Sequence, residues 1–228
     1  MEYLLSTEGL TKRYGRHKAV HGVDIHVKQG DIYGLIGRNG AGKTTLLKMI
    51  SGLAAPTEGS FSLFGKRGKE AYRYLSRVGT LIESPGVYPN LSAGENLKLK
   101  CLAMGVRKKN VIEELLDTVG LAHVGKKRVK HFSMGMKQRL GIALALVGEP
   151  DLVILDEPIN GLDPQGIAEV RETLLRLNRE QNITFILSSH ILEELSKIAT
   201  HYGMIHNGVL LQELTRDELM AKCSERIE

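Results

Sequence analysis

The sequence contains no apolar run approaching the roughly 20 residues that would span a bilayer. Residues 1–10 also lack the basic segment and long apolar stretch that mark a signal peptide. The only two cysteines, Cys101 and Cys223, lie far apart and outside any metal-binding or redox spacing, which indicates reduced thiols. We therefore expect a cytoplasmic protein that reaches a membrane only through a partner.

Charge of one sign is not strongly in excess. The 31 Lys and Arg against 26 Asp and Glu give a net charge of +5, with basic runs at 107–109 and 126–128. These runs allow two interpretations: a face for nucleic acid or a membrane surface, or an ordinary solvated surface. Neither run is interleaved with aromatic residues, so we favour the solvated surface and expect no nucleic-acid partner.

The order of apolar segments predicts an α/β fold. Short β-like segments alternate with helical ones, which is typical of a mostly parallel sheet. The segments 3–10 and 20–27 precede this alternation and indicate an N-terminal antiparallel β layer. No internal repeat and no linker interrupts the chain. We predict a single domain over residues 1–228, with a helical subdomain inserted at about 84–148.

Individual elements follow from the same patterns. Core strands are expected at 32–36, 78–82, 152–155 and 184–187. Helices are expected at 43–51, 96–104, 110–119, 136–147, 164–179 and 192–199. The turn-rich segment 52–65 is expected to return to the antiparallel layer.

Residues 37–44, Gly-Arg-Asn-Gly-Ala-Gly-Lys-Thr, match the phosphate-binding loop G-x-x-x-x-G-K-[ST]. Glycines let the backbone N–H groups turn towards phosphates, and the following helix adds its positive end. A chance glycine loop is the alternative, which the apolar strand before it and the helix after it disfavour. Lys43 is expected to reach the β- and γ-phosphates, and Thr44 to bind Mg²⁺. The expected ATP-binding residues are Gly37, Asn39, Gly40, Gly42, Lys43, Thr44 and Thr45.

Two acids follow the apolar run Leu-Val-Ile-Leu at 152–155. An apolar strand that ends in acids is where a phosphoryl-transfer enzyme holds its metal and its water. Asp156 is expected to bind Mg²⁺ and Glu157 to act as general base. His190 ends the strand expected beside this one, where its imidazole could bond a phosphate oxygen and the water. A structural histidine and a chance pair of acids are the alternatives. Because the two acids follow a phosphate-binding loop in the same chain, we favour a functional role for them over a chance pair.

With the helix start Phe-Ser-Met-Gly-Met at 132–136, this ordered set resembles the ATP-binding subunit of ATP-binding-cassette (ABC) transporters over essentially the whole chain. The resemblance implies an ABC-type P-loop NTPase, a Mg²⁺-dependent ATPase that powers membrane transport. It implies that Ser133 and Gly135 complete the ATP site of a second copy in an ATP-dependent homodimer, and that Tyr14 stacks on adenine. It also implies transmembrane permease partners and a peripheral location on the inner face of the cell membrane.

Two positions depart from the family pattern. The usual signature is Leu-Ser-Gly-Gly-Gln, of which this chain keeps Ser133 and Gly135. Glu83 stands where the family has a metal-touching glutamine, and we predict that it contacts Mg²⁺; the alternative is a solvated loop residue. Both departures resemble the subgroup of exporters for bacitracin resistance and lantibiotic self-protection, which implies a role in antibiotic resistance. The segment 84–91, with the apolar Val87 and Tyr88, is the expected membrane-subunit contact.

Two other functions remain possible for such motifs. The first is an ABC-type ATPase acting on DNA or the ribosome. DNA-repair relatives insert a long coiled coil between the phosphate loop and the signature, for which residues 44–133 leave no room. Translation-associated relatives usually carry two cassettes on one chain, and this sequence has a single copy. A nucleotide-gated binding module without hydrolysis would not need Lys43, Asp156, Glu157 and His190 together. We therefore favour the transport ATPase.

Overall fold

The main sheet of this protein has six strands. The computed structural model describes residues 3–224, and in it the strand order of this sheet is β11-β10-β4-β9-β8-β7. The strands are β4 (Ile32–Ile36), β7 (Val78–Leu81), β8 (Leu152–Leu155), β9 (Thr184–Ser189), β10 (His201–His206) and β11 (Val209–Thr215). All neighbours are parallel except β10 and β11. The carboxyl ends of β4, β8 and β9 therefore meet at one edge.

A second, antiparallel sheet is built from β1 (Leu5–Tyr14), β2 (His17–Val23), β3 (His26–Val27), β5 (Glu58–Leu63) and β6 (Lys66–Arg67). At its centre β1 and β5 come very close. A Cβ on Gly59 would lie 2.3 Å from the Gly9 carbonyl oxygen, and Gly59 has a φ of +78°. Only glycine fits such a position, because other residues carry a Cβ and disfavour positive φ.

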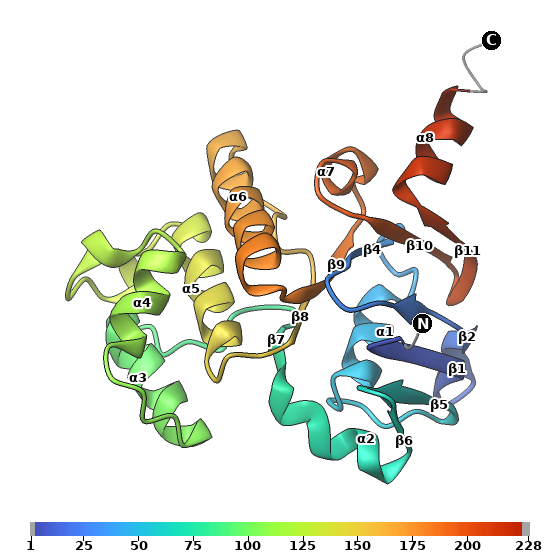
Figure 1. The fold of residues 1–228 in the computed structure, drawn as a ribbon, viewed down its shortest axis with the longest axis horizontal. Coiled ribbons are helices and arrows are strands. Elements are labelled where there is room, and N and C mark those ends of the chain that lie inside the picture. The colour runs from blue at the N-terminus through green and yellow to red at the C-terminus, as the bar shows by residue number, and fades with distance from the viewer. Residues whose placement is uncertain (1–2, 225–228) are drawn as a thin grey trace.

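The helices fall into groups (Figure 1). Helix α1 (Lys43–Ile50) follows β4 and lies on the side of the antiparallel sheet, whereas α3 (Ala93–Met104), α4 (Val111–Thr118) and α5 (Met134–Leu146) gather at the opposite end of the molecule. The remaining helices are α2 (Lys69–Arg73), α6 (Pro164–Gln181), α7 (Leu192–Ser196) and α8 (Arg216–Ser224). One hydrophobic core joins the two sheets through α1, and another joins the far face of the main sheet to α3, α5 and α6.

The fold class predicted from the sequence is confirmed. The helices α3 to α5 lie between β7 and β8 in the chain, and the boundaries of a helical subdomain at about 84–148 stay a prediction. The predicted helix at 192–199 is too long, since α7 ends at Ser196. The predicted helix at 96–104 starts too late, because Ser92 caps α3: its hydroxyl accepts from the Glu95 N–H and the Glu95 carboxylate accepts from the Ser92 N–H.

Within residues 3–224, none of the helices is long and apolar enough to cross a bilayer. Cys101 is buried and unpaired by any disulfide, and burial raises the pKa of its thiol above the ordinary value. A buried thiol with a raised pKa is poorly reactive. The side chain of Cys223 lies outside the described part of the chain.

Candidate nucleotide site

The phosphate-binding loop lies between β4 and α1, at the carboxyl edge of the main sheet. It opens on a cavity of about 370 Å³. The cavity is lined by Tyr14, His17, Ala19, Asn39, Gly40, Ala41, Gly42, Lys43, Thr44, Thr45 and Glu157. Gly42 has a φ of +105°, and a Cβ there would lie 2.5 Å from the Ala19 carbonyl oxygen. The loop can take this shape only with glycine, which brings its backbone to the cavity wall.

Lys43 is buried inside its own loop. Its ammonium donates to the Gly37 carbonyl at 2.7 Å and, more weakly, to the Arg38 carbonyl at 3.4 Å. It also lies 3.0 Å from Glu157 Oε1. That carboxylate oxygen is buried and has no hydrogen-bond partner within the described residues. The Lys43 side chain and the backbone of its loop therefore line the same cavity. This arrangement fits a bound triphosphate, which a cation and backbone N–H groups can bind together.

Asp156 is held by two hydroxyl groups at the end of β8. Its Oδ2 accepts from Thr44 at 2.7 Å, and its Oδ1 accepts from Ser188 at 2.6 Å. The sequence predicted Thr44 and Asp156 as metal ligands, and the structure brings them into direct contact. Carboxylate and hydroxyl oxygens suit Mg²⁺, which takes one or two protein ligands when phosphates and water supply the rest. The donor set therefore fits Mg²⁺.

Glu157 is turned sharply relative to β8. Its φ is 49°, in the left-handed region that is uncommon for a residue with a side chain. This turn places its carboxylate between Lys43 and His190, and His190 Nδ1 lies 2.9 Å from Glu157 Oε2. Because an ionised carboxylate only accepts, Nδ1 is the donor in this contact. The three residues predicted to be catalytic thus form one cluster.

Tyr14 lies at the mouth of the cavity, at the end of β1, with 53% of its surface exposed. The Lys12 ammonium lies 5.2 Å from the centre of its ring. An exposed aromatic ring here is available to stack on a base. His17, at the start of β2, lines the same cavity, although no sequence motif marks it. Its proximity arises only because β1 and β2 form a hairpin.

Glu83 follows β7 with a φ of 66°. Its carboxylate forms an ion pair with Lys48 at 2.5 Å, and 64% of its side chain is exposed. This hydrogen bond raises the pKa of Lys48 above its ordinary value. Within the described residues, Glu83 makes no ion pair or hydrogen bond with Thr44 or Asp156. The structure instead pairs Glu83 with Lys48, which lies one helix turn along α1 from Thr44.

Ser133 and Gly135 lie at the start of α5, where the Ser133 hydroxyl caps the helix by accepting from the Met136 N–H. Neither lines the cavity above the phosphate loop. Instead, the exposed Met134 packs against Gly161 in the loop 160–163. The contact is so close that a Cβ on Gly161 would lie 2.7 Å from the Met134 sulfur atom. The structure therefore keeps the signature segment apart from the phosphate loop and next to the segment after Glu157.

Known proteins with similar sequences include ATP-binding proteins of transport systems. The sequence profile described as ABC transporter matches residues 20–160. Over the whole chain, the sequence is 50% identical to the bacitracin transport ATP-binding protein BcrA of Bacillus licheniformis and covers 75% of that protein. Over 94% of the chain it is 42% identical to the lantibiotic transport ATP-binding protein SrtF of Streptococcus pyogenes, of which it covers 92%.

A solved structure agrees with these sequences. It is described as the ATP-binding subunit of an ABC transporter and superposes with a TM-score of 0.84 at 31% identity, covering 97% of this chain and 93% of that one. The fold and the relatives thus support the same group of proteins.

Proposed function

This chain belongs to the ABC transporter family, and from that premise we propose that it is the Mg²⁺-dependent ATPase subunit of an exporter for antimicrobial peptides or similar toxic compounds. The observation that supports the ATPase activity is the cluster of Lys43, Glu157 and His190, in which Lys43 and Glu157 line the cavity and His190 contacts Glu157. The cargo class rests on the relatives named for bacitracin and lantibiotic transport. A role on nucleic acid or the ribosome has no such support.

In the proposed reaction, the Lys43 ammonium leaves the carbonyl groups of its loop and binds the β- and γ-phosphates. Glu157, relieved of that contact, orients and deprotonates the attacking water. His190 holds the Glu157 carboxylate through Nδ1. Thr44 and Asp156 would hold Mg²⁺, which when bound offsets the negative charge of the transferring phosphoryl group. Tyr14 would stack on adenine.

The separation of Ser133 from the phosphate loop supports an ATP-dependent homodimer. In one copy, the cavity is lined by the phosphate loop, Tyr14 and Glu157, whereas Ser133 and Gly135 are not among its lining residues. A second copy arranged head to tail would bring its signature segment onto the γ-phosphate, where a helix N-terminus favours an anion. We propose that two ATP molecules are then enclosed between two copies.

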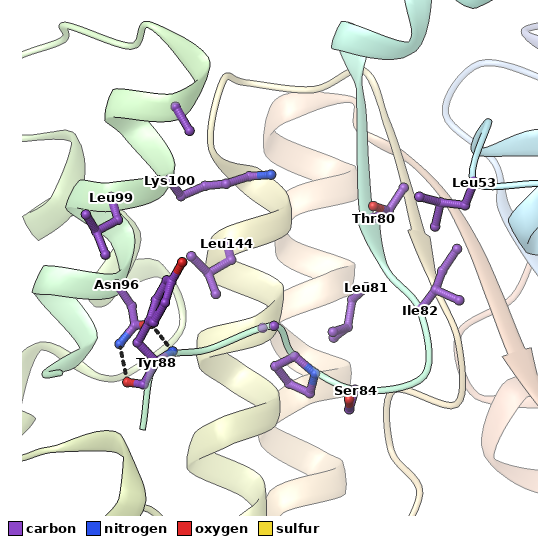
Figure 2. A pocket seen from close by; sticks show the side chains of 14 residues that line it. Leu53, Thr80, Leu81, Ile82, Ser84, Tyr88, Asn96, Leu99, Lys100 and Leu144 are labelled. Carbon is purple, nitrogen blue, oxygen red and sulfur yellow. Dashed lines mark hydrogen bonds between the residues drawn. The ribbon is translucent and has the colours of Figure 1, made fainter. Parts of the chain in front are cut away.

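Transmembrane permease subunits are the proposed partners, which would hold the chain on the cytoplasmic face of a membrane. A groove of about 370 Å³ runs between α3 and the end of β7 (Figure 2). Figure 2 shows Leu53 and Ile82 on one side of it and Tyr88 with Leu99 on the other. Exposed apolar side chains in a groove are typical of a protein interface. We propose that a short helix of a membrane subunit lies there.

Tyr88, which lines the groove, offers the most direct test of the contact with a membrane subunit. The Tyr88 backbone is fixed by the buried Asn96, whose amide group accepts from the Tyr88 N–H and donates to its carbonyl, while 61% of the residue is exposed. Tyr88→Ala should reduce transport or assembly about tenfold or more, as for an aromatic interface anchor, and leave the ATPase rate of the isolated chain unchanged. Pull-down with the membrane subunits and export assays measure both. Tyr72→Ala, an exposed tyrosine on α2, is the control; equal losses in the two variants would contradict the proposal.

A second test concerns Glu83, which we propose contacts Mg²⁺ or its water once nucleotide is bound. Its exposed ion pair with Lys48 contributes little to stability, so the carboxylate is free to move. Glu83→Gln should retain most ATPase activity, shift the Mg²⁺ concentration needed for half-maximal rate, and reduce transport more than hydrolysis. Glu58→Gln, which removes an exposed acid paired with Arg13 on the antiparallel sheet, is the control. Superimposable Mg²⁺ curves with unchanged transport would make Glu83 a bystander.

The proposal as a whole is tested by the purified chain and by cells. Phosphate release from ATP should require Mg²⁺ and cease when a chelator removes it. Cells that carry the inactive Glu157→Gln chain in place of the native one should become more sensitive to a cyclic or lanthionine-containing peptide antibiotic. Unchanged sensitivity to both peptide classes, with normal ATPase activity in the native chain, would contradict the cargo class and keep the ATPase.

A further inference from the structure

Ser188 is a fully buried residue near the end of β9. Its hydroxyl donates to Asp156 Oδ1 at 2.6 Å and accepts from the Glu157 N–H at 2.8 Å. One hydroxyl offers one proton and two lone pairs, so it makes both bonds at once. We infer that Ser188 is a positioning residue for ATP hydrolysis, which orients the proposed metal-binding and base residues together; the inference rests on the proposed function.

The first effect is on Asp156. With Oδ1 bound to Ser188 and Oδ2 bound to Thr44, both carboxylate oxygens have a hydroxyl partner and the group cannot rotate freely. The Asp156 N–H is fixed too, since it donates to the Leu81 carbonyl at 2.8 Å. Ser188 therefore presents Oδ2 to the side where Thr44 would hold Mg²⁺. Partners of this kind commonly tune a metal ligand's orientation.

The second effect is on Glu157. Its left-handed φ of 49° is disfavoured for a residue with a Cβ and persists only where neighbours hold it. The Ser188 hydroxyl supplies such a hold on the Glu157 N–H. This conformation aims the carboxylate at Lys43 and His190. Loss of the Ser188 hydroxyl leaves the Glu157 N–H without its acceptor. The Glu157 backbone can then change conformation and move the carboxylate away from Lys43 and His190.

The hydroxyl can be tested separately from side-chain shape. Ser188→Thr keeps the hydroxyl. Ser188→Val introduces a side chain of the same shape as threonine but without a hydroxyl. We expect kcat for Mg²⁺-ATP to be about 10–100-fold lower in the valine than in the threonine variant, with KM for ATP nearly equal. The valine variant should also need more Mg²⁺ for half-maximal rate. If neither β-branched variant folds, Ser188→Ala against the native chain makes the same comparison.

A control on the same strand distinguishes positioning from stability. Thr184 is equally buried on β9, and its hydroxyl accepts from the Gly30 N–H at 2.9 Å, away from the cavity. Thr184→Val should lower the melting temperature as Ser188→Val does, yet leave kcat unchanged. In a Glu157→Gln background the kcat difference between the Ser188 variants should shrink, since the contribution through the base is lost, while the difference in Mg²⁺ requirement should persist through Asp156.

The outcomes separate the two proposals. A native chain that hydrolyses no ATP overturns the proposed function. A native chain that hydrolyses ATP, with equal kcat in the threonine and valine variants, overturns the role of Ser188 alone. An equal fall of kcat in Thr184→Val would do the same, because it would trace the effect to stability.

Discussion

Replacing Glu157 with glutamine is expected to lower the rate of ATP hydrolysis about 10²–10⁴-fold, the usual contribution of a general base. Binding of ATP should persist or become tighter. The Glu157 carboxylate lies 3.0 Å from the Lys43 ammonium, so it competes with the triphosphate for that cation. Glutamine keeps the shape and removes both the competition and the repulsion of the phosphates.

The same variant should accumulate the ATP-bound homodimer, because the step that opens it is blocked. Phosphate release measures the rate, and light scattering with and without Mg²⁺-ATP measures the mass. Glu149→Gln is a matched control: Glu149 also has a left-handed φ of 54°, but its carboxylate pairs with the exposed Lys108 far from the cavity. Hydrolysis at the native rate in Glu157→Gln would overturn the assignment of the base.

Most of the nucleotide cavity could be predicted from the sequence, because its chemistry is carried by short local motifs. The glycines and the lysine that bind phosphate all lie within the segment 37–44, so they can be recognised without knowledge of the rest of the chain. The two acids, Asp156 and Glu157, are likewise adjacent in the sequence. The antiparallel layer was also predictable, because apolar residues alternate at 20–27, a segment that covers the end of β2 and β3. Here local pattern and final structure agree, as they do in sequences that fold reliably.

What the sequence did not reveal depends on contacts between distant segments. Ser188 acquires its partners only because β9 pairs with β8, which sets it beside residues 31 and 32 positions earlier. The ion pair of Glu83 was equally hidden, because its partner Lys48 is contributed by α1; the contact of Glu83 with Mg²⁺ stays a proposal. Two hydroxyls at the end of a buried strand, next to a strand ending in acids, were the available signal for Ser188.

Elements near the C-terminus were missed for a related reason. Strand β11 has exposed and half-buried residues along most of its length, so it lacks the apolar run that marks a core strand. It is held by antiparallel pairing with β10 at the sheet edge, where the backbone hydrogen bonds decide the structure. Helix α7 ended early because such short helices depend on packing more than on propensity.

Replacing Lys43 with methionine is expected to have the other large effect. Methionine keeps an apolar stem of similar length in the buried site and removes only the ammonium. Loss of a charged hydrogen bond to the phosphates should weaken ATP binding about 10–100-fold. Loss of the same charge in the transition state should lower kcat about 10²–10³-fold, as for other preorganised donors. The increase of melting temperature caused by a fixed ATP concentration should shrink accordingly.

The ligand-free protein gives this prediction a second readout. Without the ammonium, the half-buried Glu157 keeps only its contact with His190, and its Oε1 faces no cation within the described residues. A carboxylate left in this way costs about 1–3 kcal/mol, so Lys43→Met should melt earlier than the native chain even without nucleotide. Lys108→Met, which removes an exposed lysine paired with Glu114 and Glu149, should change neither value. Native ATP affinity in Lys43→Met would mean that the phosphates are held by the loop backbone alone.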